Sequence, residues 1–308
     1  MSTERKVYHN GKFVSEAEAR MSIFDTGVKV GSIVYEVTRT FNGKPFRLRD
    51  HMERLYTGLK LLEINCGMTM EQMETATQES IEANRPCFPG GLDYEINHDV
   101  SSGPPRGLFA AAVAEAGRPT VFIHLCPLRA VAPLYDTGVH AVVPPQHSIP
   151  ARLLDPKAKV RGRVHFLVAG LQARKIDPKA WALLTDEDGF ITEGTGANFF
   201  LVKDGALFTP EPRNILRGIT RKAVMELAAQ MGLPCHERNL EPYDVLIADE
   251  AFFTTTPYNI VPMTRFEGHA IGNGAPGPLT KRLISAWSEM VGLDVIAQAK
   301  QYAERAKG

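Results

Sequence analysis

The sequence has little that would mark a secreted, membrane-bound or nucleic-acid-binding protein. It contains four cysteines with no CxxC pair among them, and neither cysteine nor histidine recurs at the spacing of zinc ligands. No apolar run reaches the length of a membrane span, and the polar N-terminus lacks the apolar core of a signal peptide. The formal net charge is zero, which argues against a broad electrostatic surface for nucleic acid. We therefore expect a reduced, cytoplasmic protein that holds no metal and binds neither nucleic acid nor a membrane.

What is present describes an α+β protein of two domains. The 308 residues are 44% hydrophobic and 23% charged, an ordinary globular composition with enough length for two cores. A proline-containing stretch predicts the junction, so we expect a small α/β domain over residues 1–128, an interdomain loop over 129–137 and a large cofactor-binding domain over 138–308. The large domain should be a barrel-like, largely antiparallel sheet with helices outside, because its strands are short and joined by turns.

Local signals place the turns and helices. The pairs Asn10-Gly11, Asn42-Gly43, Asp188-Gly189 and Asp204-Gly205 each predict a hairpin. Helical spacing of apolar residues predicts one helix around residues 49–64, and a capping box predicts a second that begins at Thr69 and ends before Pro86. In the second half, residues 221–232 and 277–292 predict two amphipathic helices.

A lysine and an acid in the middle of the chain suggest a chemistry. Lys159 lies in a short irregular run, and Glu193 follows 34 positions later in a glycine-rich turn. A lysine amine can condense with the aldehyde of pyridoxal phosphate as a Schiff base, and a carboxylate can keep the pyridine nitrogen protonated. Because most lysines are solvated surface charges, this pairing needs a more specific pattern beside it.

That pattern is the run DEDGFITEGTGANFFLV, which resembles the class IV (fold-type IV) family of pyridoxal-phosphate enzymes. The family motif E-G-x-x-x-N-x-F stands here as Glu193, Gly194, Asn198 and Phe200, and the resemblance extends from about residue 35 to the end of the chain. The family includes branched-chain and D-amino-acid aminotransferases, (R)-selective amine transaminases and aminodeoxychorismate lyase. The resemblance implies a fold-type IV architecture, pyridoxal 5′-phosphate as cofactor, Lys159 as the Schiff-base lysine and Glu193 as the partner of the pyridine nitrogen.

A phosphate site is expected at a helix start. Gly218 precedes a helix that begins near Thr220, and free N–H groups with the positive end of the helix dipole suit a phosphate. By resemblance, the L-x-G-I-T-R run implies Gly218, Ile219 and Thr220 as cofactor contacts. The threonine-rich turn after D-E-x-F likewise implies Thr255 and Thr256, although the next residue, Pro257, has no N–H to donate.

From the first domain, the H-x-x-R-L spacing implies Arg54 as a phosphate ligand, for which a guanidinium is suited. On the strand before it, Tyr35, Val37 and Arg39 alternate onto one face, where they would line the substrate pocket. A plain core role for Tyr35 and Val37 is the alternative, whereas a buried arginine needs an anionic partner such as a substrate carboxylate.

Two further arginines are candidates at the substrate end. Arg106 lies in the loop SSGPPRG, where the D-amino-acid branch has a carboxylate-binding arginine. Branched-chain enzymes carry a tyrosine five positions after the lysine, bonded to the phenolic oxygen of the cofactor, but this sequence has Val164 there, and Arg163 is our candidate replacement.

We therefore predict a homodimeric aminotransferase that moves an amino group between an amino acid, or an amine, and a 2-oxo acid by a ping-pong mechanism. The sequence leaves open a D-amino acid, a branched-chain amino acid or an (R)-amine as donor. Two alternatives remain: an aminodeoxychorismate-type lyase with the same cofactor, and a binding protein on the same fold with a decayed site.

Overall fold

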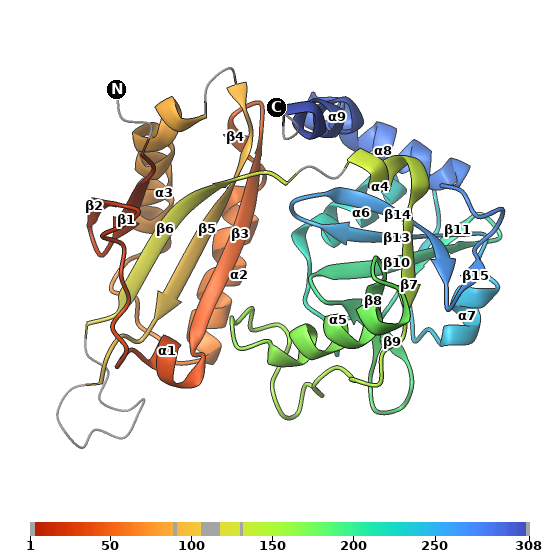
Figure 1. Ribbon diagram of the computed structural model, residues 1–308, viewed down its shortest axis with the longest axis horizontal. Coiled ribbons are helices and arrows are strands. Elements are labelled where there is room, and N and C mark those ends of the chain that lie inside the picture. Colours follow the sequence, from red (N-terminus) through yellow and green to blue (C-terminus); the bar gives the residue numbers. More distant parts are fainter. Residues whose placement is uncertain (1–3, 89–90, 106–117, 130–131, 306–308) are drawn as a thin grey trace. The chain divides into compact units, whose positions relative to one another are not determined.

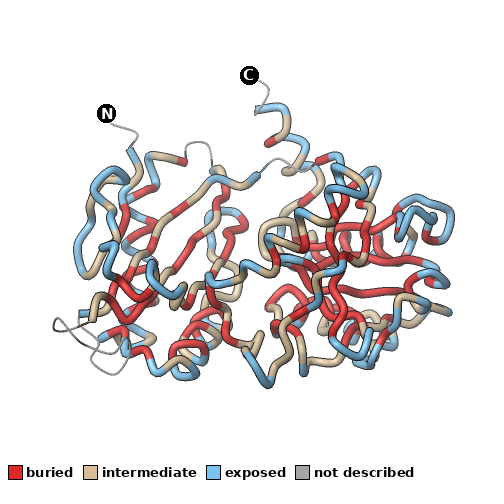
Figure 2. The backbone as a smooth tube through the Cα atoms, turned by 60° about the horizontal axis from the view of Figure 1, so that its bottom comes forward, coloured by how far each residue is buried: buried red, intermediate tan, exposed pale blue. Residues whose placement is uncertain are grey.

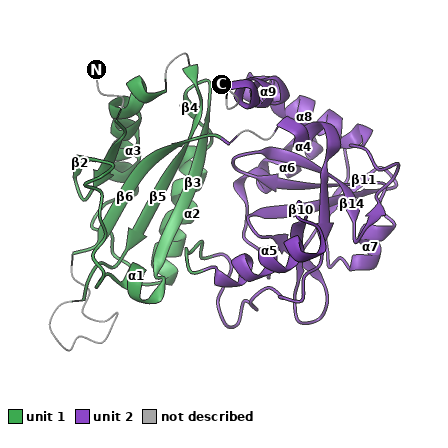
Figure 3. Cartoon of the chain, viewed as in Figure 1, with its two compact units in different colours: residues 1–128, 158–162 green, residues 129–157, 163–308 purple. Residues whose placement is uncertain are grey.

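The computed structural model describes residues 4–88, 91–105, 118–129 and 132–305, and Arg106 lies outside these ranges. The chain divides into two compact units, residues 1–128 with 158–162 and residues 129–157 with 163–308 (Figure 3). Residues 158–162, which include Lys159, thus belong to the first unit although they come from the second half of the sequence. Among the described residues, no helix combines the length and apolarity needed to cross a bilayer.

The first unit is an antiparallel sheet in the order β2-β1-β6-β5-β3-β4. Helices α2 and α3 pack on one face of this sheet, against β3, β6 and β1 (Figure 1). Leucine, methionine and isoleucine residues of both layers are buried and form the core. Figure 2 colours the buried stretches of the backbone red. The strands are β1 (Lys6–His9), β2 (Lys12–Ser15), β3 (Ile33–Phe41), β4 (Lys44–Pro45), β5 (Tyr94–Ser101) and β6 (Thr120–Pro127). The helices are α1 (Thr26–Val30), α2 (Leu48–Leu61), α3 (Met70–Asn84) and the 3₁₀ turn η1 (Arg85–Cys87).

The second unit is built on a sheet that closes on itself. Strands β10, β13, β14, β7, β8 and β9 follow one another, and β9 pairs with β10 to complete the barrel. The strands are β7 (Val139–Val142), β8 (Trp181–Thr185), β9 (Ile191–Gly194), β10 (Ala197–Lys203), β11 (Ala206–Thr209), β12 (Cys235–Glu237), β13 (Glu250–Thr255), β14 (Asn259–Phe266) and β15 (His269–Ala270). The helices are α4 (Ala132–Thr137), α5 (Val164–Ile176), α6 (Ile219–Gln230), α7 (Pro242–Leu246), α8 (Pro278–Val291) and α9 (Val295–Arg305).

Alternation along the strands separates two faces of this barrel. Phe199 and Phe253 lie in an apolar cluster with residues of β7, β8 and β14. Their neighbours Phe200 and Phe252 point to the opposite face and stack at 5.1 Å. On that same face the backbone N–H groups of Leu279 and Thr280 in α8 donate to the carboxylate of Glu250. Helices therefore cover the outer face of the barrel, and the predicted α+β class with an outer helical layer is confirmed.

Most local predictions are confirmed. Asn10-Gly11, Asn42-Gly43 and Asp204-Gly205 join paired strands, Asp188-Gly189 lies in the turn between β8 and β9, and Thr69 caps α3 reciprocally with Gln72.

Three features of the second half differ from expectation. The large sheet is not antiparallel throughout, because β7 pairs in parallel with β14 and β8, and β11 pairs in parallel with β12. Helix α9 was not predicted. The segment expected as a loop contains α4, since Pro133 stands in the first turn of that helix, where its missing N–H costs nothing.

Candidate active site

Lys159 is fixed beside strand β3 by backbone hydrogen bonds. The N–H of Tyr35 donates to the carbonyl of Lys159, and the N–H of Arg161 donates to the carbonyl of Ile33, each at 2.9 Å. The lysine ammonium then lies 4.5 Å from the centre of the Tyr35 ring, at cation–π distance. The structure thus brings together the predicted reactive lysine and the first predicted substrate residue.

The other two residues of this strand face behave differently from each other. Val37 is half-buried, whereas Arg39 is only 4% exposed. The Nε of Arg39 donates to the carbonyl of Thr40 at 3.2 Å, and its guanidinium lies 4.1 Å from the centre of the Phe41 ring.

The opposite face of β3 carries a buried carboxylate that orients Arg54. Glu36 is fully buried and accepts from Nε and Nη2 of Arg54 at 2.8 and 2.6 Å, while His51 Nδ1 lies 3.0 Å from the same carboxylate. Burial alone would raise the pKa of Glu36, but Arg54 and His51 outweigh it and hold that pKa well below its ordinary value. Burial lowers the pKa of His51 despite Glu36, so His51 is a neutral imidazole at pH 7. Arg54 therefore carries the positive charge of this group in a fixed bidentate geometry.

Glu193 is clamped in the second unit. It is 4% exposed, and its Oε2 accepts from Asn198 Nδ2 and from the N–H of Leu216, both at 3.2 Å. Asn198 lies directly opposite Glu193 in the β9–β10 hairpin and also donates to the carbonyl of Leu216 at 2.8 Å. The motif asparagine thus holds both the motif glutamate and the chain that leads into α6.

Gly218 stands where this chain turns into α6, against Asn198. A Cβ atom at Gly218 would meet Asn198 Oδ1 at 2.0 Å, so any larger residue here has to displace the Asn198 carboxamide. Among the described residues, no side chain caps this helix start, and Ile219 and Thr220 in its first turn are buried. The first N–H groups of a helix have no partner within the helix. The start of α6 at Gly218, Ile219 and Thr220 therefore presents backbone N–H groups that would suit an anion, next to the Glu193 clamp.

The threonine turn ends strand β13, the next strand along from β10. Thr254 pairs with Asn198 across the two strands, so their side chains share a face. Within the described residues, the buried Thr254 hydroxyl has no hydrogen-bond partner. Thr255 is buried and Thr256 is half-buried in the turn that follows. A buried hydroxyl on the face that carries Glu193 and Asn198 suits a polar ligand.

Arg163 and Val164, which follow Lys159 in the chain, lie at the start of α5. Arg163 precedes the helix, with its guanidinium 5.2 Å from the centre of the Phe166 ring, and Val164 is 68% exposed.

Sequence reasoning missed the buried group behind Arg54. Glu36 was readable as a charged residue inside an apolar strand, and His51 and Arg54 share one face of a helix because they are three positions apart. It also missed the chain of Arg161, Asp99 and His124 on the Tyr35 face of the sheet, for which no sequence signal exists because its members come from three separate segments.

Comparison with known proteins gives this geometry a family. Residues 33–266 match the family described as Amino-transferase class IV. The chain belongs to that family. A Methanocaldococcus jannaschii protein named "Putative branched-chain-amino-acid aminotransferase" is 35% identical over 279 residues, covering 90% of this chain and 93% of its own. The D-alanine aminotransferase of Bacillus licheniformis is 29% identical over 282 residues, covering 91% and 95%.

Solved structures of the family share the fold. The Escherichia coli branched-chain amino acid aminotransferase has a TM-score of 0.86 at 27% identity, covering 94% of this chain and 95% of its own. The T.th. branched-chain amino acid aminotransferase with pyridoxamine 5′-phosphate has a TM-score of 0.85 at 26% identity, covering 97% and 96%.

Class IV aminotransferases use pyridoxal phosphate, and the residues of this chain fit that group. The second unit offers a buried carboxylate held by two donors for a protonated ring nitrogen. It also offers a helix start at a closely packed glycine and an unpartnered buried hydroxyl among the described residues, both suited to a phosphate. The first unit offers the amine of Lys159 and an oriented guanidinium.

Proposed function

We propose that the protein is an aminotransferase that moves an amino group between an amino acid and a 2-oxo acid, with pyridoxal phosphate joined to Lys159 and paired through its ring nitrogen with Glu193. The single observation that carries this proposal is the clamp on Glu193, in which Asn198 and Leu216 hold a buried carboxylate beside the glycine start of α6. Buried charges are costly, so a carboxylate kept in this way has a purpose beyond packing.

When bound, the cofactor supplies an electron sink that makes the hydrogen on the amino-bearing carbon of the substrate removable. The chain's own residues hold and move the proton. The amine of Lys159, kept in place by its backbone bonds to β3, takes this proton and returns it on the other side of the half-reaction. Glu193 keeps the ring nitrogen protonated.

Phosphate binding is assigned to the start of α6, the end of β13 and Arg54. We propose that Ile219 and Thr220 bind it through the first turn of α6, and that Thr255 and Thr256 bind it from the end of β13. Arg54, kept in one orientation by Glu36, adds the positive charge.

Substrate binding is assigned to the other face of β3. We propose that Tyr35, Val37 and Arg39 line the substrate pocket, and that Arg163 replaces the absent tyrosine at the phenolic oxygen of the cofactor. The relatives named above include both branched-chain and D-alanine enzymes, so the donor is to be decided by assay.

We also propose a homodimer in the cytoplasm. Val164, Leu167 and Leu171 expose 68, 59 and 49% of their surface in one stripe along α5, and Ile23 and Phe24 expose 72 and 63% before α1. Apolar side chains exposed in groups suit a protein interface. All four cysteines are free thiols, which suits a reducing compartment.

The test begins with cofactor attachment. The purified protein should be yellow, and borohydride should fix the cofactor to the peptide that contains Lys159, as read by mass spectrometry. Lys159→Ala should be colourless after dialysis. A panel of D-alanine, L-leucine and (R)-1-phenylethylamine, each with 2-oxoglutarate and with pyruvate, then identifies the donor. A label on another lysine would refute the assignment, and pyruvate formed without any acceptor would favour the lyase.

A further inference from the structure

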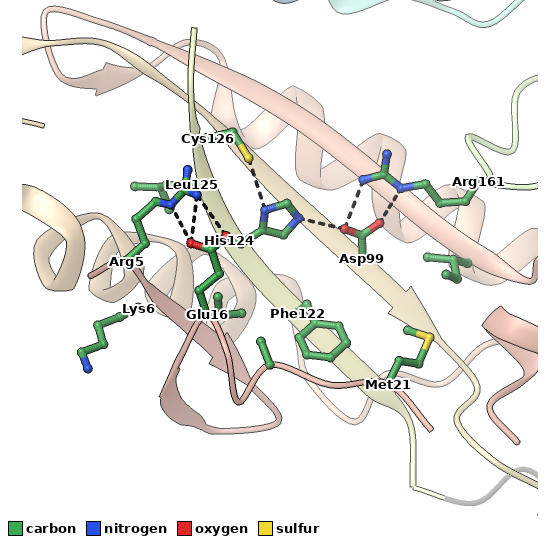
Figure 4. Close-up of a pocket in the computed structure, with 13 residues that line it drawn as sticks. Arg5, Lys6, Glu16, Met21, Asp99, Phe122, His124, Leu125, Cys126 and Arg161 are labelled. Carbon is green, nitrogen blue, oxygen red and sulfur yellow. Dashed lines mark hydrogen bonds and ion pairs between the residues drawn. The ribbon is translucent and has the colours of Figure 1, made fainter. Parts of the chain in front are cut away.

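The first unit contains a pocket of about 540 Å³ that the roles above do not use. Its wall is formed by β1, β5, β6, the segment from Glu16 to Met21 and the side chain of Arg161 (Figure 4). The side chain of Lys6 points away from the other polar groups of this wall (Figure 4). A concave pocket of this size that combines apolar and polar groups is typical of a small-molecule site. The apolar part of the lining is large for a surface depression and consists of Val7, Ala19, Met21, Ile33, Phe122 and Leu125.

One side of the pocket is a connected polar chain. Arg161 donates to Asp99 through Nε to Oδ1 at 2.6 Å and through Nη2 to Oδ2 at 3.1 Å, and the same Oδ2 lies 3.2 Å from His124 Nε2. His124 Nδ1 lies 3.5 Å from the sulfur of Cys126. Burial lowers the pKa of His124, but the hydrogen bonds to Asp99 and Cys126 raise it to about 9, so His124 is an imidazolium at neutral pH.

The charges that face one another in the wall do not balance. Arg5 is paired with Glu16 at 2.9 Å, and Asp99 is shared between Arg161 and the protonated His124. Three cations of this group therefore face two carboxylates, which leaves one positive charge in excess. Asp99 engages the Nε and Nη2 edge of Arg161, and a guanidinium has further N–H donors on Nη1. One excess charge suits a monoanion such as a carboxylate better than a dianionic phosphate.

The chain also connects this wall to the reactive lysine. The guanidinium of Arg161 lies 3.9 Å from the centre of the Tyr35 ring, and the ammonium of Lys159 lies 4.5 Å from the same centre. A ligand held by Arg161 is therefore one aromatic ring away from the amine of Lys159.

We propose that this pocket binds a small organic acid, with its carboxylate against Arg161 and His124 and its apolar body across Phe122 and Met21. The acid is either the substrate's own acid end or a separate acid that occupies the pocket. The second possibility does not depend on the proposed function, whereas the first does.

Cys126 provides a direct reporter of occupancy. Its sulfur lines the pocket, while Cys87 and Cys235 are half-buried elsewhere and serve as internal controls in the same molecule. Alkylation of each cysteine by iodoacetamide is followed by mass spectrometry on the full-length protein with increasing hexanoate. We expect hexanoate to slow alkylation at Cys126 several-fold and to leave the other two rates unchanged. Hexylamine and hexanol, which have the same apolar body, should protect weakly.

Variants of the wall test the assigned contacts. Arg161→Gln should raise the hexanoate concentration for half-protection about tenfold, as expected for loss of one charged hydrogen bond. Arg161→Lys should restore part of the lost affinity for hexanoate. Arg152→Gln removes an exposed ion pair with Glu187 in the second unit and should change nothing. Thermal denaturation shows whether each variant is folded. Equal protection by hexylamine, or unchanged protection in a folded Arg161→Gln protein, would overturn the proposal.

The pH profile separates His124 from the arginines. Protection should be constant from about pH 6 to 8 and weaken as pH rises through about 9, where His124 loses its proton. The His124→Gln variant should bind hexanoate more weakly, and its protection should not weaken further as pH rises through about 9. Each rate is compared with and without hexanoate at the same pH, because the rate of thiol alkylation by iodoacetamide itself depends on pH. The charged or titratable groups around His124 are Asp99, Cys126, Arg161, Arg5, Lys6 and Glu16 in the pocket wall and His98 on β5.

Competition assigns the source of the acid. Once a donor is found, hexanoate that competes with it for turnover identifies the pocket as the place of the substrate's acid end. Hexanoate that protects Cys126 without competing identifies a separate acid. If the protein shows no transamination, protection of Cys126 still tests the pocket, so failure of the activity and failure of the pocket are distinguishable.

Discussion

Replacing Gly218 by alanine tests the arrangement that places the Glu193 clamp beside the phosphate end of the site. The new Cβ would lie 2.0 Å from Asn198 Oδ1 and 3.2 Å from its Cγ, whereas a Cβ atom essentially never comes within 3.0 Å of such an atom. The carboxamide must therefore move by about 1 Å or more. We expect that movement to weaken or break its bonds to Leu216 at 2.8 Å and to Glu193 at 3.2 Å.

The expected loss follows from these bonds. A hydrogen bond to a charged group contributes about 1.5–3 kcal/mol, so the affinity for pyridoxal phosphate should fall about 10- to 100-fold. The backbone does not explain such a loss, because φ −66° and ψ 136° at Gly218 are open to alanine. The gain of about 0.4–1 kcal/mol from a less flexible unfolded chain also roughly offsets the weaker helix cap.

The assay is titration of the apo-protein with pyridoxal phosphate, followed by absorbance, in a double-mutant cycle. Gly218→Ala, Asn198→Ala and the double variant are compared, with Gly196→Ala as control, because a Cβ at Gly196 meets no described atom within 4 Å. If the alanine acts through the carboxamide, the double variant should bind no more weakly than Asn198→Ala alone. Additive losses, or wild-type affinity in Gly218→Ala, would refute the reasoning.

Three other predictions concern stability and assembly. Glu36→Gln should lower the free energy of unfolding at pH 7 by about 3–5 kcal/mol, because it removes the buried carboxylate that faces the charge of Arg54. The pKa of Glu36 is lower in the folded protein than its ordinary value of 4.5, so its contribution to stability is present above pH 4.5 and is lost as pH falls through the folded-state pKa. In urea denaturation, the difference in unfolding free energy between the wild type and Glu36→Gln should therefore narrow in acid, and a difference that stays constant would contradict this. Thr254→Val should raise the stability of the apo-protein by about 1 kcal/mol, because it removes a buried hydroxyl that has no partner among the described residues, and at the same time weaken cofactor binding; a loss of stability in urea would speak against it. The double variant Leu167→Glu/Leu171→Glu should shift sedimentation toward a monomer, whereas an unchanged dimer would place the interface elsewhere.

Local chemistry made much of this fold readable from the sequence. The Asn-Gly pairs at residues 10–11 and 42–43 predict hairpins because both residue types readily adopt the positive φ angles of such turns, and they do so here. The capping box is equally local, because Thr69 and Gln72 are only three positions apart. The barrel class followed from short strands, but the parallel pairing of β7 did not, because strand direction is decided by connections that no local pattern records.

In the site, too, contacts between residues close in sequence were predictable and contacts between distant segments were not. Glu193 and Asn198 sit five positions apart in one hairpin, so a motif captures their contact. Asp99, His124 and Arg161 meet only because β6, β5, β3 and residues 159–161 follow one another across the sheet, and hydrophobic periodicity carries no information on such a meeting.

The pairing of residues 159–161 with β3 has a consequence for any attempt to divide the protein. The chain passes from one unit to the other at residues 128–129, 157–158 and 162–163. Residues 158–162, between the last two crossings, pair with the edge of β3 near Tyr35, which would otherwise be an open edge of the sheet. A fragment that stops at residue 128 would therefore expose β3 as an unpaired edge strand, with the N–H of Tyr35 and the carbonyl of Ile33 available to any extended peptide. Such a fragment should self-associate, and a synthetic peptide spanning residues 156–163 should suppress that association by restoring the missing border.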